Sequence, residues 1–139
     1  MITHVLDTDT LTLFQHGHSK VAARCAAAPP DSLGITVITV EEQFLGWYTE
    51  VRKAKRDADI VNAYDRMTAF ATFIKQLPIL TFDSAAIKRY RQLKALKLNV
   101  PKKDLCIAAT ALELGAKIVT CNISDFGRVT GLGIEDWSK

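Results

Sequence analysis

The sequence predicts an α/β fold with a mainly parallel central sheet. Short apolar runs of strand character alternate along the chain with longer stretches of helical periodicity. This alternation is typical of parallel sheets, because each parallel strand needs a crossover connection before the next. The run at 33–38 is nearly continuously apolar, as expected of a strand covered on both faces.

The expected elements follow in chain order, with turn and cap residues between them. We expect strands at 2–6, 33–38, 79–82 and 117–120, and a last short strand starting at Ile134. Thr8 or Asp9, Thr39 and Asp83 are suited to cap the helices that follow the first three strands. Strong helical periodicity at 57–76 and 104–114 predicts two further helices, ended by Pro78 and Gly115 respectively.

The composition is that of an ordinary globular protein. Hydrophobic residues make up 48% and charged residues 24% of the 139 residues, which predicts one domain spanning 1–139. No apolar run is long enough for a membrane span, and the first residues do not have the pattern of a signal peptide. The three cysteines are scattered and form no metal-binding or disulfide pattern. We therefore expect a cytoplasmic protein without membrane association.

Positive charge is moderate overall but gathers in two stretches. The net charge is +3, which permits an anionic partner without requiring one. One basic cluster lies at 52–56, and a longer one extends from Lys88 to Lys103. Each cluster is also explained by a solvated helix face, so charge alone does not identify a partner.

Acidic residues recur where predicted strands end. Asp7 follows the first strand, Glu42 lies early in the helix after the second, and Asp104 opens the helix before the fourth. Asp125 follows the fourth strand in a turn. Any one of these acids is explained as a cap, a helix-dipole partner or a turn residue. Together they predict a cluster, since ligands bind beyond the carboxyl ends of parallel strands.

Such a cluster predicts a hard cation and hydrolytic chemistry. Converging carboxylates repel each other, and Mg²⁺ or Mn²⁺ relieves the repulsion and prefers oxygen ligands. A cation of this kind suits phosphodiester hydrolysis, because it polarises the phosphoryl oxygen and activates water. The sequence has no evident Ser–His or Cys–His pair and no glycine-rich phosphate loop.

Four motifs in order resemble the PIN-domain ribonucleases, and most closely the VapC-type toxins of bacterial toxin–antitoxin pairs. They are VLDTDTL at 5–11, ITVITVEE at 35–42, PKKDLCIAATALELGAKIVTCNISDF at 101–126 and GLGIEDW at 131–137. Each motif alone is weak, but their order over nearly the whole chain is specific. The resemblance implies a PIN-like α/β/α sandwich and a single PIN-like nuclease domain.

The resemblance also implies a site, a reaction and partners. It places the metal ligands and catalytic acids at Asp7, Glu42, Asp104 and Asp125, holding Mg²⁺ or Mn²⁺. The implied activity is that of an endoribonuclease cutting structured RNA such as tRNA, in a homodimer silenced by a cognate antitoxin. Asn122, where some members have an acid, and Asp9, where an amide or hydroxyl is common, depart from the family pattern.

The aromatic residues that follow Glu42 allow two interpretations. Phe44, Trp47 and Tyr48, together with Val51, widen the apolar face of the expected helix. Core packing explains most of them. Any that are exposed would instead mark an antitoxin groove or a dimer surface.

Two other classes share part of this pattern. LDTDTL also fits a phosphatase of the haloacid-dehalogenase type, with Asp7 as nucleophile and Asp9 as general acid. That interpretation gives Glu42 no role, and the closing acidic pair of that family is missing. A receiver-like domain with Asp83 as phosphoacceptor lacks the adjacent acids expected after the first strand. A degenerate PIN domain that binds without catalysing a reaction is a third alternative, although all the expected acids are present.

Overall fold

The computed structural model describes all residues from Met1 to Lys139. Its five strands are β1 (His4–Leu6), β2 (Leu33–Thr36), β3 (Ile79–Leu80), β4 (Lys117–Val119) and β5 (Ile134–Glu135). Its seven helices are α1 (Thr8–Gln15), α2 (Ser19–Ala27), α3 (Val37–Lys53), α4 (Asp57–Ile74), α5 (Ser84–Ala95), α6 (Lys102–Leu114) and α7 (Ile123–Phe126). None of the helices combines the length and apolarity that crossing a membrane requires.

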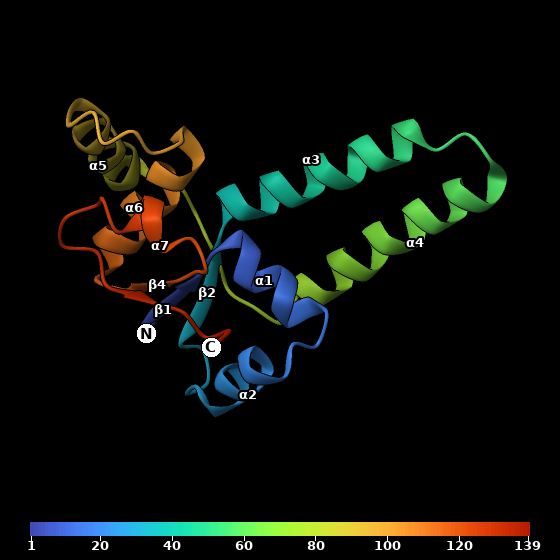
Figure 1. The fold of residues 1–139 in the computed structure, drawn as a ribbon, viewed down its shortest axis with the longest axis horizontal. Coiled ribbons are helices and arrows are strands. Elements are labelled where there is room, and N and C mark those ends of the chain that lie inside the picture. The colour runs from blue at the N-terminus through green and yellow to red at the C-terminus, as the bar shows by residue number, and fades with distance from the viewer.

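The five strands form one sheet in the order β3-β2-β1-β4-β5, and every neighbouring pair is parallel. The chain leaves β1 toward β2 and β3, and then returns to the other side of β1 to form β4 and β5 (Figure 1). The order of the strands therefore reverses at β1. In open α/β sheets, the crevice at such a reversal is where ligands bind.

The sheet is buried on both faces, which confirms the three-layer prediction. Val5 and Ile118 face a core shared with α5, α6 and α7, whereas Leu6 and Val119 face a second core shared with α1, α2 and α4. Successive residues of β1 and β4 thus point to opposite faces, as the period of a strand requires. Because both faces of the sheet are buried, these strands are apolar throughout and do not alternate between apolar and polar residues.

Helices α3 and α4 form a long hairpin that extends away from the sheet (Figure 1). Near the sheet, Phe44 of α3 stacks edge-on against the buried Phe70 of α4, with ring centroids 5.3 Å apart. Farther out the two helices have no third layer beneath them, and Tyr48 and Tyr64 are each 54% exposed. The hairpin is therefore anchored at its base and open at its tip.

Three helix starts differ from the prediction. Helix α6 starts at Lys102 and not at Asp104, which lies in its first turn. The second strand ends at Thr36, whose hydroxyl accepts the backbone N–H of Thr39, so Thr36 rather than Thr39 caps α3. Because α3 starts at Val37, Glu42 lies in its second turn rather than its first. Helix α1 starts at Thr8 with Asp7 at the cap position, but the Asp7 side chain makes no cap hydrogen bond. That carboxylate is therefore free to face the sheet edge.

The predicted helix boundaries at Asp83 and Gly115 are confirmed. Asp83 accepts the backbone N–H of Ala86 and caps α5. Gly115 ends α6 in the left-handed conformation, with φ 65°, which glycine adopts without a steric penalty.

Candidate active site

Asp7 lies at the carboxyl end of the central strand, where the strand order reverses. Its backbone N–H donates to the carbonyl of Val119 at 2.9 Å, so Asp7 continues the pairing of β1 with β4. Its side chain is only 6% exposed. The Thr120 hydroxyl donates to Asp7 Oδ2 at 2.9 Å across this crevice. A strand-end position, and not a helix cap, therefore fixes this carboxylate.

The environment of Asp7 disfavours its charge. Burial and the neighbouring Asp9 carboxylate raise the pKa of Asp7 to about 7, although hydrogen bonds from Thr8 and Thr120 oppose the rise. The charge of Asp104 adds to the rise. A buried carboxylate of this kind is costly unless a cation compensates it.

Asp9 is held against the loop that follows β4. Its Oδ2 accepts the backbone N–H of Cys121 at 3.1 Å and the hydroxyl of Thr120 at 3.5 Å. Its Oδ1 accepts from Thr10 at 3.3 Å. Asp9 therefore ties α1 to the β4–α7 loop and adds negative charge beside Asp7.

Glu42 reaches the same edge from α3. The Thr8 hydroxyl lies 3.2 Å from Glu42 Oε1 and 3.3 Å from the hydroxyl of Thr39, which is fully buried. The start of α1 and the start of α3 are thus joined through hydroxyl groups. This contact holds Glu42, and not the preceding Glu41, beside the start of α1, where its charge acts on Asp104. Glu41 instead pairs with Lys103 of α6.

Asp104 lies in the first turn of α6 and has no hydrogen-bond partner among the side chains around it. Burial, followed by the charges of Asp125, Glu42 and Asp9 in that order, raises the pKa of Asp104 to about 6. Three carboxylates from three other elements therefore act on Asp104 at electrostatic range.

Asp125 lies in the short helix α7 and is the one acid of the group with a cationic neighbour. Asn122 donates through Nδ2 to Asp125 Oδ2 at 3.0 Å and also caps α7. Arg128 Nη1 lies 3.5 Å from Asp125 Oδ1. Asn122, one of the two positions at which the sequence departs from the family pattern, thus orients Asp125.

We refer to Asp7, Asp9, Glu42, Asp104 and Asp125 as the acidic edge. The pKa values of Asp7 and Asp104 are raised by the charges of other acids in this group. The four predicted acids and Asp9 therefore form one electrostatically coupled cluster. However, no three acidic, histidine or cysteine side chains are grouped as a ready-made metal site. Several carboxylates point instead toward hydroxyl, amide or backbone donors, which keeps them apart while they repel each other.

The donor set nevertheless fits a hard divalent cation. All the side chains of the acidic edge offer carboxylate oxygens, the ligands that Mg²⁺ and Mn²⁺ prefer. Burial, and after it the charges of neighbouring acids, raise the pKa values of Asp7 and Asp104, so ionising these two carboxylates costs free energy. A cation bound there would remove that cost.

Sequence reasoning missed the hydroxyl groups of Thr8 and Thr120, which contact the acids directly. Thr120 is completely buried at the end of β4. A polar residue closing an apolar strand is the signal that could have identified it. For Thr8, the signal was its position between two acids at a strand end.

Comparison with known sequences yields relatives of one kind, although no family model matches the chain. Ribonuclease VapC1 of Haemophilus influenzae is 25% identical over 98% of this chain and 98% of its own length. The tRNA(fMet)-specific endonuclease VapC of Shigella flexneri is 37% identical, over 48% of this chain and 53% of its own length.

Comparison with solved structures agrees with this result. A crystal structure of DNA-bound VapBC from Salmonella typhimurium has a chain with a TM-score of 0.81 and 25% identity, covering 99% of both chains. VapBC-1 from nontypeable Haemophilus influenzae has a chain with a TM-score of 0.78 and 25% identity, covering 100% of both. The fold is thus that of the PIN-domain class. Within this class, the chain is similar over its whole length to VapC-type toxins, which confirms the predicted resemblance.

Proposed function

We propose that this protein is a metal-dependent endoribonuclease, the toxin of a type II toxin–antitoxin pair, acting as a single nuclease domain in the cytoplasm. One observation carries the proposal: acids from four separate segments lie at the switch point of a VapC-type fold, where burial and mutual repulsion raise the pKa of two of them. A structural role gives no reason to keep two such carboxylates at raised pKa. Perturbed pKa values in such a crevice are typical of functional sites.

Asp7, Glu42, Asp104 and Asp125 are the residues that would hold Mg²⁺ or Mn²⁺. When bound, the ion polarises the phosphoryl oxygen of the scissile bond and lowers the pKa of water. Thr120 fixes the orientation of Asp7, and Thr8 fixes that of Glu42, through the hydrogen bonds described above. The buried position of Asp7 keeps its carboxylate from rotating freely. These contacts support catalysis by holding the acids in place before substrate arrives.

The proposed substrate is structured RNA such as tRNA. The VapC of Shigella flexneri, named as a tRNA(fMet)-specific endonuclease, supports this choice. So does the excess of basic over acidic residues in the chain, which has a net charge of +3.

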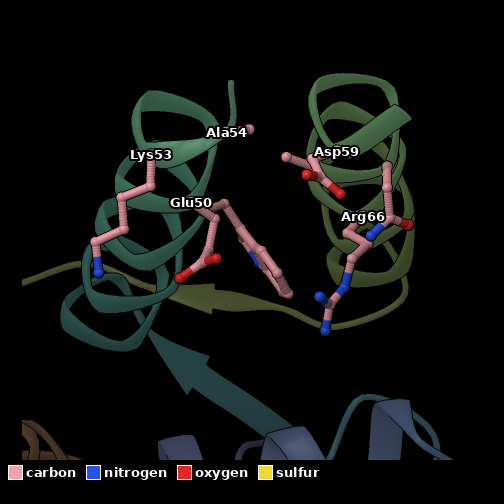
Figure 2. A pocket seen from close by; sticks show the side chains of 8 residues that line it. Glu50, Lys53, Ala54, Asp59 and Arg66 are labelled. Carbon is pink, nitrogen blue, oxygen red and sulfur yellow. The ribbon is translucent and has the colours of Figure 1, made fainter. Parts of the chain in front are cut away.

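The proposed protein partner is a cognate antitoxin, as in the VapBC complexes that share this fold. A cavity of about 260 Å³ between α3 and α4 supports a peptide-binding role for the hairpin. Figure 2 shows Glu50 and Lys53 of α3 on one side and Asp59 and Arg66 of α4 on the other. The indole N–H of Trp47 in this cavity is buried without an acceptor, and such a group is costly unless a partner satisfies it.

We also propose a homodimer, built on the exposed face of α3. Leu45 and Tyr48 are 58% and 54% exposed on this helix, whereas Phe44 packs into the core. Large apolar side chains that lie together on one exposed helix face are typical of protein–protein interaction sites. Sedimentation of the purified chain with and without Leu45→Glu tests this part of the proposal. An unchanged monomer in both would contradict it.

The main test is cleavage of a tRNA by the purified chain in Mg²⁺ or Mn²⁺ and in excess EDTA. We expect cleavage that depends on the metal and is lost in Asp7→Asn. Asp65→Asn, an exposed acid of α4, is the matched control and should cleave like the wild type. Undiminished cleavage in EDTA would contradict the metal-dependent mechanism.

The alternative is a phosphatase with Asp7 as nucleophile and Asp9 as general acid, and the two share their first acid. Glu42→Gln and Asp9→Asn separate them, with tRNA and an aryl phosphate as substrates. We expect RNA cleavage alone, lost in Glu42→Gln and largely kept in Asp9→Asn, because an amide still accepts the Cys121 N–H. The phosphatase alternative requires aryl phosphate turnover that depends on Asp9, since a general acid contributes about 10²–10⁴-fold.

A further inference from the structure

A second cavity opens beside the acidic edge, between α3, α5 and α6. Its volume is about 410 Å³, within the roughly 300–1,000 Å³ typical of small-ligand pockets. We call it the basic pocket, because four cationic side chains line it: Arg91, Lys94, Lys102 and Lys103. These residues come from the long basic stretch that the sequence alone could not assign.

The positive charge of the basic pocket is largely uncompensated. Glu41 is the only acid among its lining residues, and it pairs with Lys103. None of the ion pairs in the protein involves Arg91, Lys94 or Lys102. Three cations therefore line one cavity without a carboxylate partner. Such an arrangement favours an anionic ligand.

The floor of the basic pocket is apolar and aromatic. Phe82, Ile38 and Tyr90, which we call its floor, line it together with the cations. Tyr90 as a whole is only 6% exposed, but its hydroxyl is not among the buried polar atoms that lack a partner, and it makes no hydrogen bond to another residue. A hydroxyl that opens into a cavity in this way can hydrogen-bond to a ligand there. Cations over an aromatic floor are the combination by which proteins bind single-stranded nucleic acid, with phosphate on the rim and a base on the ring.

The basic pocket and the acidic edge share one wall. Lys103 and Glu41 pair across α6 and α3, and the next residue along each of these two helices, Asp104 or Glu42, belongs to the acidic edge. A chain of nucleotides leaving the acids along this junction meets the cations directly.

We propose that the basic pocket binds one unpaired nucleotide of the RNA substrate, next to the phosphodiester that lies at the acidic edge. Arg91, Lys94 and Lys102 hold the backbone phosphates, and the base lies against Phe82, where the Tyr90 hydroxyl hydrogen-bonds to it. This inference rests on the proposed ribonuclease function and adds a substrate-positioning site to it. The pocket takes no part in the bond cleavage itself.

The test measures binding of a fluorescein-labelled, 12-nucleotide single-stranded RNA in EDTA, so that neither cleavage nor metal contributes. Arg91→Gln with Lys94→Gln should weaken binding about tenfold in 0.1 M salt. The slope of log K against log salt should fall by about 1.4, since each lost contact with a single strand accounts for about 0.7. Lys88→Gln with Lys97→Gln removes the same charge next to the pocket and should change affinity less than twofold.

A second variant addresses the floor without changing charge or packing. Tyr90→Phe removes only the hydroxyl and should weaken RNA binding about threefold, the loss of one hydrogen bond. In steady-state cleavage, Arg91→Gln with Lys94→Gln should raise KM about tenfold for a 12-nucleotide RNA and leave kcat unchanged.

The outcomes separate this proposal from the ribonuclease function. If the wild type cleaves RNA but the Arg91 and Lys94 variant binds like its control, the nucleotide site is wrong and the ribonuclease stands. If no RNA is cleaved but binding follows the predicted slopes, the nucleotide site stands and the ribonuclease is wrong. Loss of self-association or of antitoxin binding, with RNA affinity unchanged, would make the basic pocket a protein interface and overturn the proposal.

Discussion

Glu135 and the acids of the acidic edge all lie in partly buried surroundings, but the side chains around them differ. Glu135 accepts hydrogen bonds from Arg24, Lys117 and the indole of Trp137 at 3.0, 3.0 and 2.9 Å, and His4 Nε2 lies 3.2 Å away. These contacts, led by that of Trp137, lower the pKa of Glu135 to about 2. Asp104 has no such partners, and its pKa rises to about 6.

The difference separates an acid that stabilises the fold from acids that do not. Glu135 joins β5 to β1, β4 and α2 through its cationic neighbours, so its charge holds elements together. The acids of the edge repel each other instead and make folding less favourable when they are ionised. Residues kept at such a cost are expected to serve a function that needs their charge.

The largest expected effect is on catalysis. Asp104→Asn removes a carboxylate of the acidic edge and should reduce RNA cleavage at least about 100-fold, the loss of roughly 3 kcal/mol of transition-state stabilisation. Glu113→Gln, which changes an exposed acid of the same helix, should leave the rate within about twofold. Equal losses in the two variants would mean that the acidic edge is not distinct from other acids.

The next effect is on the free energy of unfolding, and its direction follows from the raised pKa of Asp7. The pKa of Asp7 is about 7 in the folded protein and 3.8 ordinarily, so its contribution to stability is full below pH 3.8 and lost as pH rises through 7. In EDTA at pH 8, Asp7→Asn should therefore be more stable than the wild type by about 2–4 kcal/mol. The difference should disappear near pH 4, as measured by urea unfolding at both pH values.

The fold was predictable because its signals are local. Apolar runs gave the strands, and the caps at Asp83 and Gly115 marked helix ends correctly. The cap of α3 was assigned wrongly, because threonine stands at both 36 and 39 and either suits a cap. Only the pairing of Thr36 with Leu80 places Thr36 at the end of β2, and such long-range pairing is not visible in the local sequence.

The acidic edge was predictable in outline and not in detail. Acids at strand ends converge whenever the strands are parallel, so the spacing along the chain was sufficient to propose Asp7 and Asp125. The bonds of Thr120 to Asp7 and of Asp9 to Cys121 join residues more than 100 positions apart. They depend on the register of β1 and β4, which no local pattern encodes. The basic pocket was hidden for the same reason, since its cations come from two separate helices.

Mg²⁺ should offset the loss of stability that the repelling carboxylates of the acidic edge cause. Because the ion binds only the folded arrangement, it should stabilise the wild type by about 1.4 kcal/mol at a tenfold excess over its Kd. Asp104→Asn should lose most of this gain, and Glu135→Gln should keep it. Thermal unfolding with and without 5 mM Mg²⁺ at constant ionic strength is the measurement. The same gain in all three proteins would place the ion elsewhere.

The smallest effect is on the stability contributed by Glu135, the acid whose charge is compensated by its neighbours. Its pH dependence is opposite to that of Asp7. The pKa of Glu135 is about 2 in the folded protein and 4.5 ordinarily, so its contribution to stability is present above pH 4.5 and lost as pH falls through 2. Glu135→Gln should therefore destabilise the protein by about 1–2 kcal/mol at pH 7, since the side chain is 24% exposed and water screens part of the interaction. Glu113→Gln breaks only the more exposed pair with Arg89 and should cost less than about 0.5 kcal/mol. The gap between the wild type and Glu135→Gln should close toward pH 2, whereas the gap between the wild type and Asp7→Asn opens toward pH 8. If both differences in stability widened in the same direction of pH, Glu135 and the acidic edge would not differ in how far neighbouring groups compensate their charge.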